Sequence, residues 1–184
     1  MGQLEQFFHD EKISLPVLVK AALAHVQFET VHPFLDGNGR VGRLLITLLL
    51  CHAGVLTQPL LYLSLYFKQN RATYYSLLDQ VRMAGDWEAW IDFFLEGVRT
   101  TARGAVTTAQ RLVELFSSDT GKIQTSGRAA GSALRVHSAL RERPILSLPD
   151  ICRRTGLSFP AATNGMALLE KLGIVRELTG RQRN

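Results

Sequence analysis

A twelve-residue stretch near the start of this 184-residue chain constrains it more than any other part. From His32 to Arg43 the sequence reads HPFLDGNGRVGR, and a long apolar run follows it. One histidine, one carboxylate, three glycines and two arginines therefore stand directly before a long apolar run, at the start of a predicted helix. Glycines at the start of a helix let unpaired backbone N–H groups converge on an anion. The stretch predicts a loop that binds phosphate.

The charged residues of this stretch add a base and a metal ligand to the loop. Asp36 is a single carboxylate, and one carboxylate together with the phosphates of a nucleotide is a common way to hold Mg²⁺. Histidine is the side chain that best suits proton transfer near neutral pH, so His32 is the candidate general base. Two arginines spaced i, i+3 lie on one helix face and can bind phosphate oxygens. The candidate phosphate-binding residues are Gly37, Asn38, Gly39, Arg40 and Arg43.

Two other nucleotide-binding motifs are excluded. Gly37, Gly39 and Gly42 satisfy the G-x-G-x-x-G spacing, but that fingerprint follows a strand and needs an acidic residue about 20 positions further on. Here a predicted helix precedes the glycines, and no Asp or Glu occurs between Asp36 and Asp79. A P-loop is excluded because no Gly-Lys-Ser/Thr sequence is present.

The stretch HPFLDGNGRVGR is similar to the signature of the Fic domain family, HPFx[D/E]GNGRxxR, at every fixed position. The resemblance implies transfer of AMP from MgATP to a Tyr, Thr or Ser hydroxyl of a target protein, with release of pyrophosphate. It assigns His32 as the base, Asp36 as the Mg²⁺ ligand and the glycine loop as the anion hole. It also implies that Tyr75 lines the adenine pocket. The segment RATYYSLLDQVRMAGDWEAWIDFFLEGV resembles the one that follows the motif in many bacterial members.

The predicted fold is all-α, with a Fic-type helical bundle over residues 1–116. Ser14 is a predicted N-cap of a helix that runs toward the motif. Nearly every residue from Leu44 to Cys51 is apolar, which predicts a helix buried on most sides. Residues 117–132 are rich in Ser, Thr and Gly and are the predicted linker or hinge.

Residues 133–184 resemble a small winged helix-turn-helix module. The pattern predicts a short helix from Pro149 to Arg154, a second helix from Ser158 to Leu172, and a strand from Ile174 to Leu178. Residues 1–128 carry 12 basic and 12 acidic residues, whereas residues 129–184 carry 9 and 4. The basic excess of this module suggests contact with DNA or with a protein.

Basic residues on the module are placed unevenly. Its predicted recognition helix has Lys171 as its single basic residue, near the end that is far from the bases in most such complexes. Five arginines lie on the preceding helix and on the predicted wing: Arg153, Arg154, Arg176, Arg181 and Arg183. Docking of a protein partner or formation of a homodimer is an equally open interpretation.

The chain also departs from the family pattern. We expect the β-hairpin flap that precedes the motif in family members to be missing, and the wing to be truncated. An inhibitory [S/T]xxxE[G/N] sequence is absent. Cys51 and Cys152 are far apart and suggest no disulfide framework, and no apolar run reaches the roughly 20 residues of a membrane span. These features favour a cytoplasmic enzyme.

Two alternative functions stay open at this level. The same phosphate loop could remove AMP or transfer another phosphate-containing group. A member of a different class, a DNA-binding regulator in which the Fic unit senses nucleotide, would carry the same residues.

Overall fold

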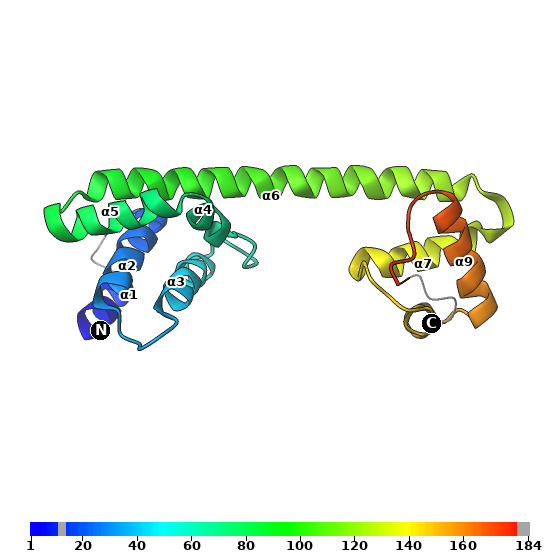
Figure 1. Ribbon diagram of the computed structural model, residues 1–184, viewed down its shortest axis with the longest axis horizontal. Helices are drawn as coiled ribbons and strands as arrows, with labels where there is room; N and C mark the ends of the chain where they lie inside the picture. The colour runs from blue at the N-terminus through cyan, green and yellow to red at the C-terminus, as the bar shows by residue number, and fades with distance from the viewer. Residues whose placement is uncertain (11–13, 180–184) are drawn as a thin grey trace. The chain divides into compact units, whose positions relative to one another are not determined.

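The computed structural model describes residues 1–10 and 14–179, and the chain forms two compact units, Met1–Thr108 and Ala109–Asn184 (Figure 1). No strand occurs among the described residues, so the predicted all-α class is confirmed. The first unit begins with five helices, and their bounds are α1 (Gly2–His9), α2 (Val17–Val31), α3 (Asn38–His52), α4 (Leu63–Gln69) and α5 (Arg71–Ala84). The remaining elements are α6 (Trp87–Gln124), the short 3-10 helix η1 (Gly127–Ala129), α7 (Ala130–Glu142), α8 (Leu148–Thr155) and α9 (Phe159–Lys171).

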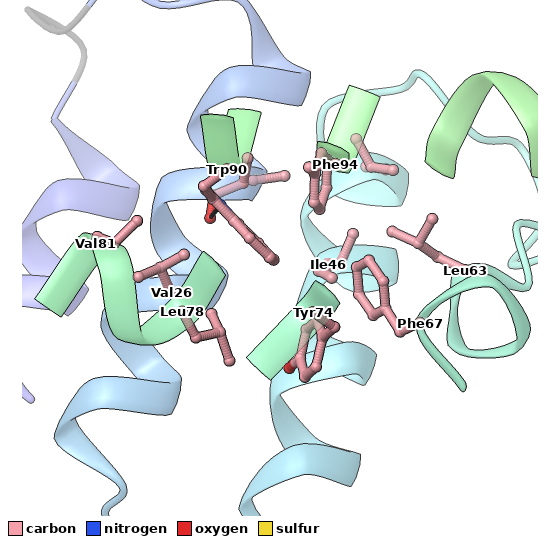
Figure 2. Close-up of a cluster of buried hydrophobic side chains, with 12 residues drawn as sticks. Val26, Ile46, Leu63, Phe67, Tyr74, Leu78, Val81, Trp90 and Phe94 are labelled. Atoms are coloured by element: carbon pink, nitrogen blue, oxygen red, sulfur yellow. Dashed lines mark hydrogen bonds between the residues drawn. The ribbon is translucent and has the colours of Figure 1, made fainter. Parts of the chain in front are cut away.

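An aromatic core holds the first unit together. Trp90 and Phe94 of α6 are fully buried, and Figure 2 shows them with Ile46 of α3 and Leu78 of α5 in the same cluster. The indole N–H of Trp90 donates to the carbonyl oxygen of Ala22 at 3.0 Å. Burial of such large side chains contributes roughly 1.5–3 kcal/mol each, so this cluster fixes the positions of the helices around the motif.

The helix before the motif begins later than the sequence predicted. Its N-cap is Pro16, whose ψ of 136° is extended, and Ser14 lies outside the helix. The residue before a proline is disfavoured in the α region, which keeps Leu15 out of the helix. The prediction of Ser14 as N-cap is therefore wrong, while the helix itself ends directly before the motif as expected.

The helix after the motif is less buried than its apolar sequence predicted. Gly42, Ile46 and Leu50 form the single buried stripe of α3 together with Asn38, whereas Leu44 and Leu48 are 55% and 56% exposed. These residues share one face of α3, because positions four residues apart lie on the same side of a helix. The helix α3 packs against α2. The prediction of a helix buried on most sides is wrong, since α3 buries one face and leaves Leu44 and Leu48 exposed on the other.

The long helix α6 extends into the predicted linker. Residues 117–124 are helical, and Asp119 and Ile123 are buried in the second unit. A Ser- and Thr-rich sequence can stay helical where a few of its side chains pack against other helices, because packing contributes more than intrinsic propensity. η1 follows within the remainder of the predicted linker.

The second unit contains a helix-turn-helix. The hydroxyl of Ser147 caps α8 by accepting from the backbone N–H of Asp150 at 3.3 Å. Gly156, at φ 65°, ends α8 in the left-handed conformation that glycine adopts easily, and α9 starts after Ser158. The two predicted helices are confirmed, with α8 one residue longer at each end than expected.

The predicted strand from Ile174 to Leu178 is wrong. These residues form bends and irregular backbone, while Ile174 and Val175 pack against the core of the second unit. A strand needs a neighbouring chain for its ladder, and none pairs with this segment among the described residues. The predicted wing residues Arg181 and Arg183 lie outside the described residues.

None of the helices in residues 1–10 and 14–179 combines the length and the apolar content needed to cross a membrane.

Candidate active site

His32 stands at the end of α2 in an unusual backbone conformation. It is the C-cap of the helix, with φ 47° and ψ 58°, and its backbone N–H donates to the carbonyl oxygen of Phe28 at 3.0 Å. This left-handed conformation turns the chain sharply out of α2 and into the glycine loop. The side chain is exposed, which leaves the imidazole open to a substrate.

The side chain of Asn38 closes the loop between His32 and α3. Asn38 is 2% exposed, accepts from the backbone N–H of Phe34 at 2.9 Å and donates to the Phe34 carbonyl oxygen at 2.6 Å. These two hydrogen bonds hold the loop in one conformation. The side chain of Asn38 is thus fully engaged, and its contribution to an anion site is left to its backbone N–H.

Glycine is required at the turn that opens α3. Gly37 has φ 83°, and its carbonyl oxygen accepts from the N–H groups of Arg40 and Val41, both at 3.0 Å. Arg40 folds back over this turn, and its guanidinium lies 3.5 Å from the carboxylate of Asp36. Both side chains are largely exposed, so the pair is weak and can separate when a ligand offers other partners.

Arg43 and Tyr75 line one pocket of about 360 Å³ in the first unit. Arg43 is half-buried and reaches back along α3 until its guanidinium lies against Gly39, where an added Cβ would be 3.1 Å from Nη1. Tyr75 is about half exposed and stands on α5. The two residues are 32 positions apart in the sequence, and the packing of α5 brings them to the same cavity.

The pocket contains further cations that the sequence reasoning missed. Lys68 of α4 and Arg71 of α5 also line it, and the guanidinium of Arg71 lies 5.6 Å from the centre of the Tyr75 ring. The segment KQNR places the two cations three residues apart, and that spacing was the available signal. The other lining residues are Tyr62, Ser64, Phe67 and Tyr74. Cations beside aromatic faces suit a ligand with both an aromatic ring and phosphates.

A buried polar layer supports this pocket. His25 is fully buried, with Nδ1 3.0 Å from the Gly42 carbonyl oxygen and Nε2 2.9 Å from the Tyr74 hydroxyl. Burial lowers the pKa of His25 to about 4, so its imidazole is neutral at pH 7. Glu29 is 8% exposed, and its Oε1 has no hydrogen-bond partner among the described residues. Burial raises the pKa of its carboxyl, an effect that nearby Arg43, His32 and Arg82 oppose.

The residues present fit the Mg²⁺ that the sequence predicted. No group of three or more His, Cys, Asp or Glu side chains able to hold a metal occurs among the described residues. Mg²⁺ bound to a nucleotide needs only one or two carboxylates and keeps several waters. Asp36, exposed at the loop, can supply one such carboxylate.

The other histidines contribute no ligand set. His25 is buried and hydrogen-bonded, and His137 is buried with Nε2 3.7 Å from the Asp119 carboxylate. His9 and His52 are exposed. The prediction that these four side chains are structural or on the surface agrees with these positions.

Comparison with known proteins agrees with the motif. Residues 1–50 match the model of the Fic/DOC family. The chain is similar to "Protein adenylyltransferase Fic" of Drosophila erecta, 36% identical over 102 residues, which are 55% of this chain and 19% of that protein. It is also similar to "Protein adenylyltransferase fic-1" of Caenorhabditis elegans, 31% identical over 128 residues, which are 69% of this chain and 22% of that protein. A third relative is "Protein adenylyltransferase Fic" of Aedes aegypti, 36% identical over 102 residues, which are 55% of this chain and 19% of that protein.

The aligned parts cover about a fifth of the length of each of these relatives. All three are animal proteins, and they leave the expected bacterial origin untested. The family match contains the whole stretch from His32 to Arg43, whose loop and helix start have the geometry described above. Residues 1–50 of this chain are therefore similar to the Fic/DOC family over the segment that carries the motif.

Proposed function

We propose that this protein is a nucleotidyltransferase that moves AMP from MgATP to a hydroxyl side chain of a target protein. The single observation that carries the proposal is the shared pocket of Arg43 and Tyr75, which adjoins the glycine loop through Arg43. A pocket with aromatic walls and cations beside a phosphate-binding loop suits ATP. The relatives, named protein adenylyltransferases, support a protein as the acceptor of AMP.

In the proposed reaction, His32 accepts the proton of the target hydroxyl. The hydroxyl oxygen attacks the α-phosphorus, the bond from that phosphorus to the bridging oxygen breaks, and pyrophosphate leaves in line. The product is a phosphodiester between AMP and the target side chain. The open position of the imidazole at the end of α2 supports this role, because a base must reach a substrate that comes from solvent.

The remaining loop residues balance the charge on the phosphates. The N–H groups at the start of α3, from Asn38 and Gly39, face the anion together with the positive end of the helix. Arg40 exchanges its weak pair with Asp36 for a phosphate oxygen, and Arg43 contacts the phosphates from inside the pocket. Mg²⁺, held by Asp36 and the nucleotide, would neutralise part of the phosphate charge.

The experiment that tests the proposal separates binding from chemistry. The full chain is incubated with α-labelled ATP and a cell lysate, and AMP transfer is followed for wild type and His32→Ala. His32→Ala should abolish transfer and leave the Kd for MgATP nearly unchanged, because His32 acts only as the hydroxyl loses its proton. Transfer by His32→Ala at the wild-type rate would exclude His32 as the base, and loss of MgATP binding would make it a structural residue.

Asp36→Ala is the second arm of that experiment. It should weaken MgATP binding and transfer together, since the carboxylate holds the metal that accompanies the nucleotide. Without Mg²⁺, wild type and Asp36→Ala should bind ATP with similar affinity. A difference that persists without Mg²⁺ would assign Asp36 to the loop structure rather than to the metal.

For the second unit we propose contact with a protein partner rather than with DNA. Its helix α9 carries Lys171 in the last turn as the single basic residue. Arg153 is paired with Asp150, and Arg154 lies 3.9 Å from the carboxylate of Glu142. Phosphate contacts would have to replace these pairs. An electrophoretic shift titration against salt tests this, because a protein that neutralises several DNA phosphates loses affinity steeply as salt rises.

A further inference from the structure

The backbone of His32 is held in a conformation that its own side chain disfavours. With φ 47°, it is the one non-glycine residue with positive φ among the described residues. A residue with a Cβ keeps such a conformation only where the surrounding structure determines it. The groups that fix the last turn of α2 therefore control where the imidazole points.

Arg82 of α5 is attached to that last turn by two hydrogen bonds. Its Nη2 donates to the carbonyl oxygen of Glu29 at 3.1 Å, and its Nε donates to Oγ1 of Thr30 at 3.3 Å. The Thr30 hydroxyl in turn donates to the carbonyl oxygen of Val26 at 2.8 Å, which leaves its oxygen lone pair directed to Arg82. On its own helix, Arg82 pairs with the carboxylate of Asp79 at 2.8 Å. A planar guanidinium thus connects two consecutive residues of α2 to α5.

We propose that Arg82 is a positioning residue for His32, and this inference rests on the proposed function of His32 as the base. The two hydrogen bonds fix the rotation of the final turn of α2, and His32 follows Thr30 by two residues. Arg82 also places a positive charge at the negative end of that helix. The two hydrogen bonds from the Arg82 guanidinium, called here the Arg82 fork, fix both the distance and the orientation of the last turn of α2 relative to α5. Loss of the Arg82 fork therefore lets this turn and the His32 imidazole move relative to the glycine loop.

The fold of the first unit depends little on Arg82. Its helix α5 is anchored by Tyr74, Leu78 and Val81, which are 4%, 1% and 6% exposed, whereas the Arg82 side chain is 34% exposed. Removal of a partly exposed guanidinium leaves these apolar contacts in place. The expected effect is therefore on the geometry of the base and not on the presence of the folded unit.

The chain offers a matched control in Arg99. Arg99 of α6 pairs with Glu96 three residues earlier at 2.6 Å, as Arg82 pairs with Asp79, and it donates two hydrogen bonds to that carboxylate on its own helix. Arg82→Ala and Arg99→Ala remove the same side chain and the same kind of pair. They differ in the hydrogen bonds to α2.

The test compares AMP transfer and MgATP binding in the full chain. Arg82→Ala should lower kcat by about 10- to 100-fold, because a displacement of about 1 Å at a reacting group costs about that much. The KM, the Kd for MgATP and the calorimetric stoichiometry of binding should stay at wild-type values, which excludes a smaller folded fraction. Guanidinium ion at millimolar concentration should restore part of kcat in Arg82→Ala, and Arg99→Ala should match wild type.

A double-mutant cycle and a spectrum complete the test. Thr30→Val removes one acceptor of the fork, and its effect on kcat should be largely absent once Arg82 is already Ala. In an NMR spectrum, the chemical shifts of the His32 ring should change in Arg82→Ala, while those of the exposed His52 ring should stay the same. This measurement needs no activity. Unchanged His32 resonances or an unchanged kcat in Arg82→Ala would overturn the inference. Shifted resonances with no AMP transfer by wild type would instead overturn the proposed function and leave the positioning contact standing.

Discussion

The hydroxyl of Tyr74 lies 2.9 Å from Nε2 of His25, and both side chains are buried. The other ring nitrogen of His25 is 3.0 Å from the carbonyl oxygen of Gly42, which can only accept a hydrogen bond. Nδ1 therefore carries the proton, and Nε2 accepts from the Tyr74 hydroxyl. One neutral imidazole thus connects α2 with α3, which carries the phosphate loop, and with α5, which carries the wall of the pocket.

Stability should fall in mild acid because of His25. Burial lowers its pKa from 6.5 to about 4, so the unfolded chain takes up a proton before the folded protein does. The contribution of neutral His25 to the free energy of unfolding, about 3 kcal/mol, is present above pH 6.5 and is lost as the pH falls toward 4. Urea unfolding between pH 7.5 and 4.5 measures it. His25→Gln should be less stable at pH 7, and its free energy of unfolding should change less with pH over this range. His52→Gln should show the same pH dependence as wild type. A wild-type slope in His25→Gln would contradict the assignment.

Glu29→Gln should become more stable relative to wild type as the pH rises. Burial raises the pKa of this carboxyl above its ordinary value of 4.5, so the folded state favours its protonated form. The contribution of Glu29 to stability is therefore full below pH 4.5 and is lost as the pH rises through the folded-state value. Unfolding free energies of both proteins from pH 4 to pH 7 test the sign. Glu114→Gln, at an exposed position of α6, is the control, and a constant difference between Glu29→Gln and wild type would refute the argument.

Gly42→Ala should destabilise the first unit by about 1–3 kcal/mol. An added Cβ would lie 2.5 Å from Oε1 of Glu29 and 3.2 Å from both His25 and Phe28, all of which are buried. Gly104→Ala is the matched control, since that helical glycine has no atom within 4 Å of an added Cβ. The control should gain about 0.5–1 kcal/mol from helix propensity. Calorimetric melting of both variants measures the difference, and equal midpoints would show that α2 and α3 can separate at little cost.

Arg43→Ala should weaken binding of ATP far more than binding of AMP. The guanidinium lines the pocket beside the loop, where it can contact the outer phosphates, and a hydrogen bond to a charged group contributes about 1.5–3 kcal/mol. The expected loss for ATP is about 10- to 100-fold in Kd. Titration calorimetry with both nucleotides tests this, with Arg103→Ala, at an exposed position of α6, as the control. Equal losses for ATP and AMP would remove Arg43 from the phosphate site.

The sequence by itself determined the local features of the candidate site. The glycine loop directly before a helix and the i, i+3 placement of Arg40 and Arg43 depend on residues within one or two helical turns of each other, whereas the structure starts α3 already at Asn38. Steric limits on the backbone and the helical repeat fix such features before any tertiary contact forms. The all-α class and the helix-turn-helix of α8 and α9 follow from the same short-range patterns of apolar and capping residues.

Tertiary structure decided which residues share the pocket and which faces are covered. The sequence contains no rule that brings Lys68 and Arg71 to Arg43, because that contact depends on how α4 and α5 pack on α3. In the same way, the apolar run of α3 could not reveal that its outer face stays exposed, since hydrophobicity indicates that a residue can be buried and not whether a neighbour covers it. The strand expected after Gly173 failed for a related reason, because a strand forms only where another strand pairs with it. The contact of Arg82 with α2 joins residues more than 50 positions apart, and only the packed fold brings those residues together.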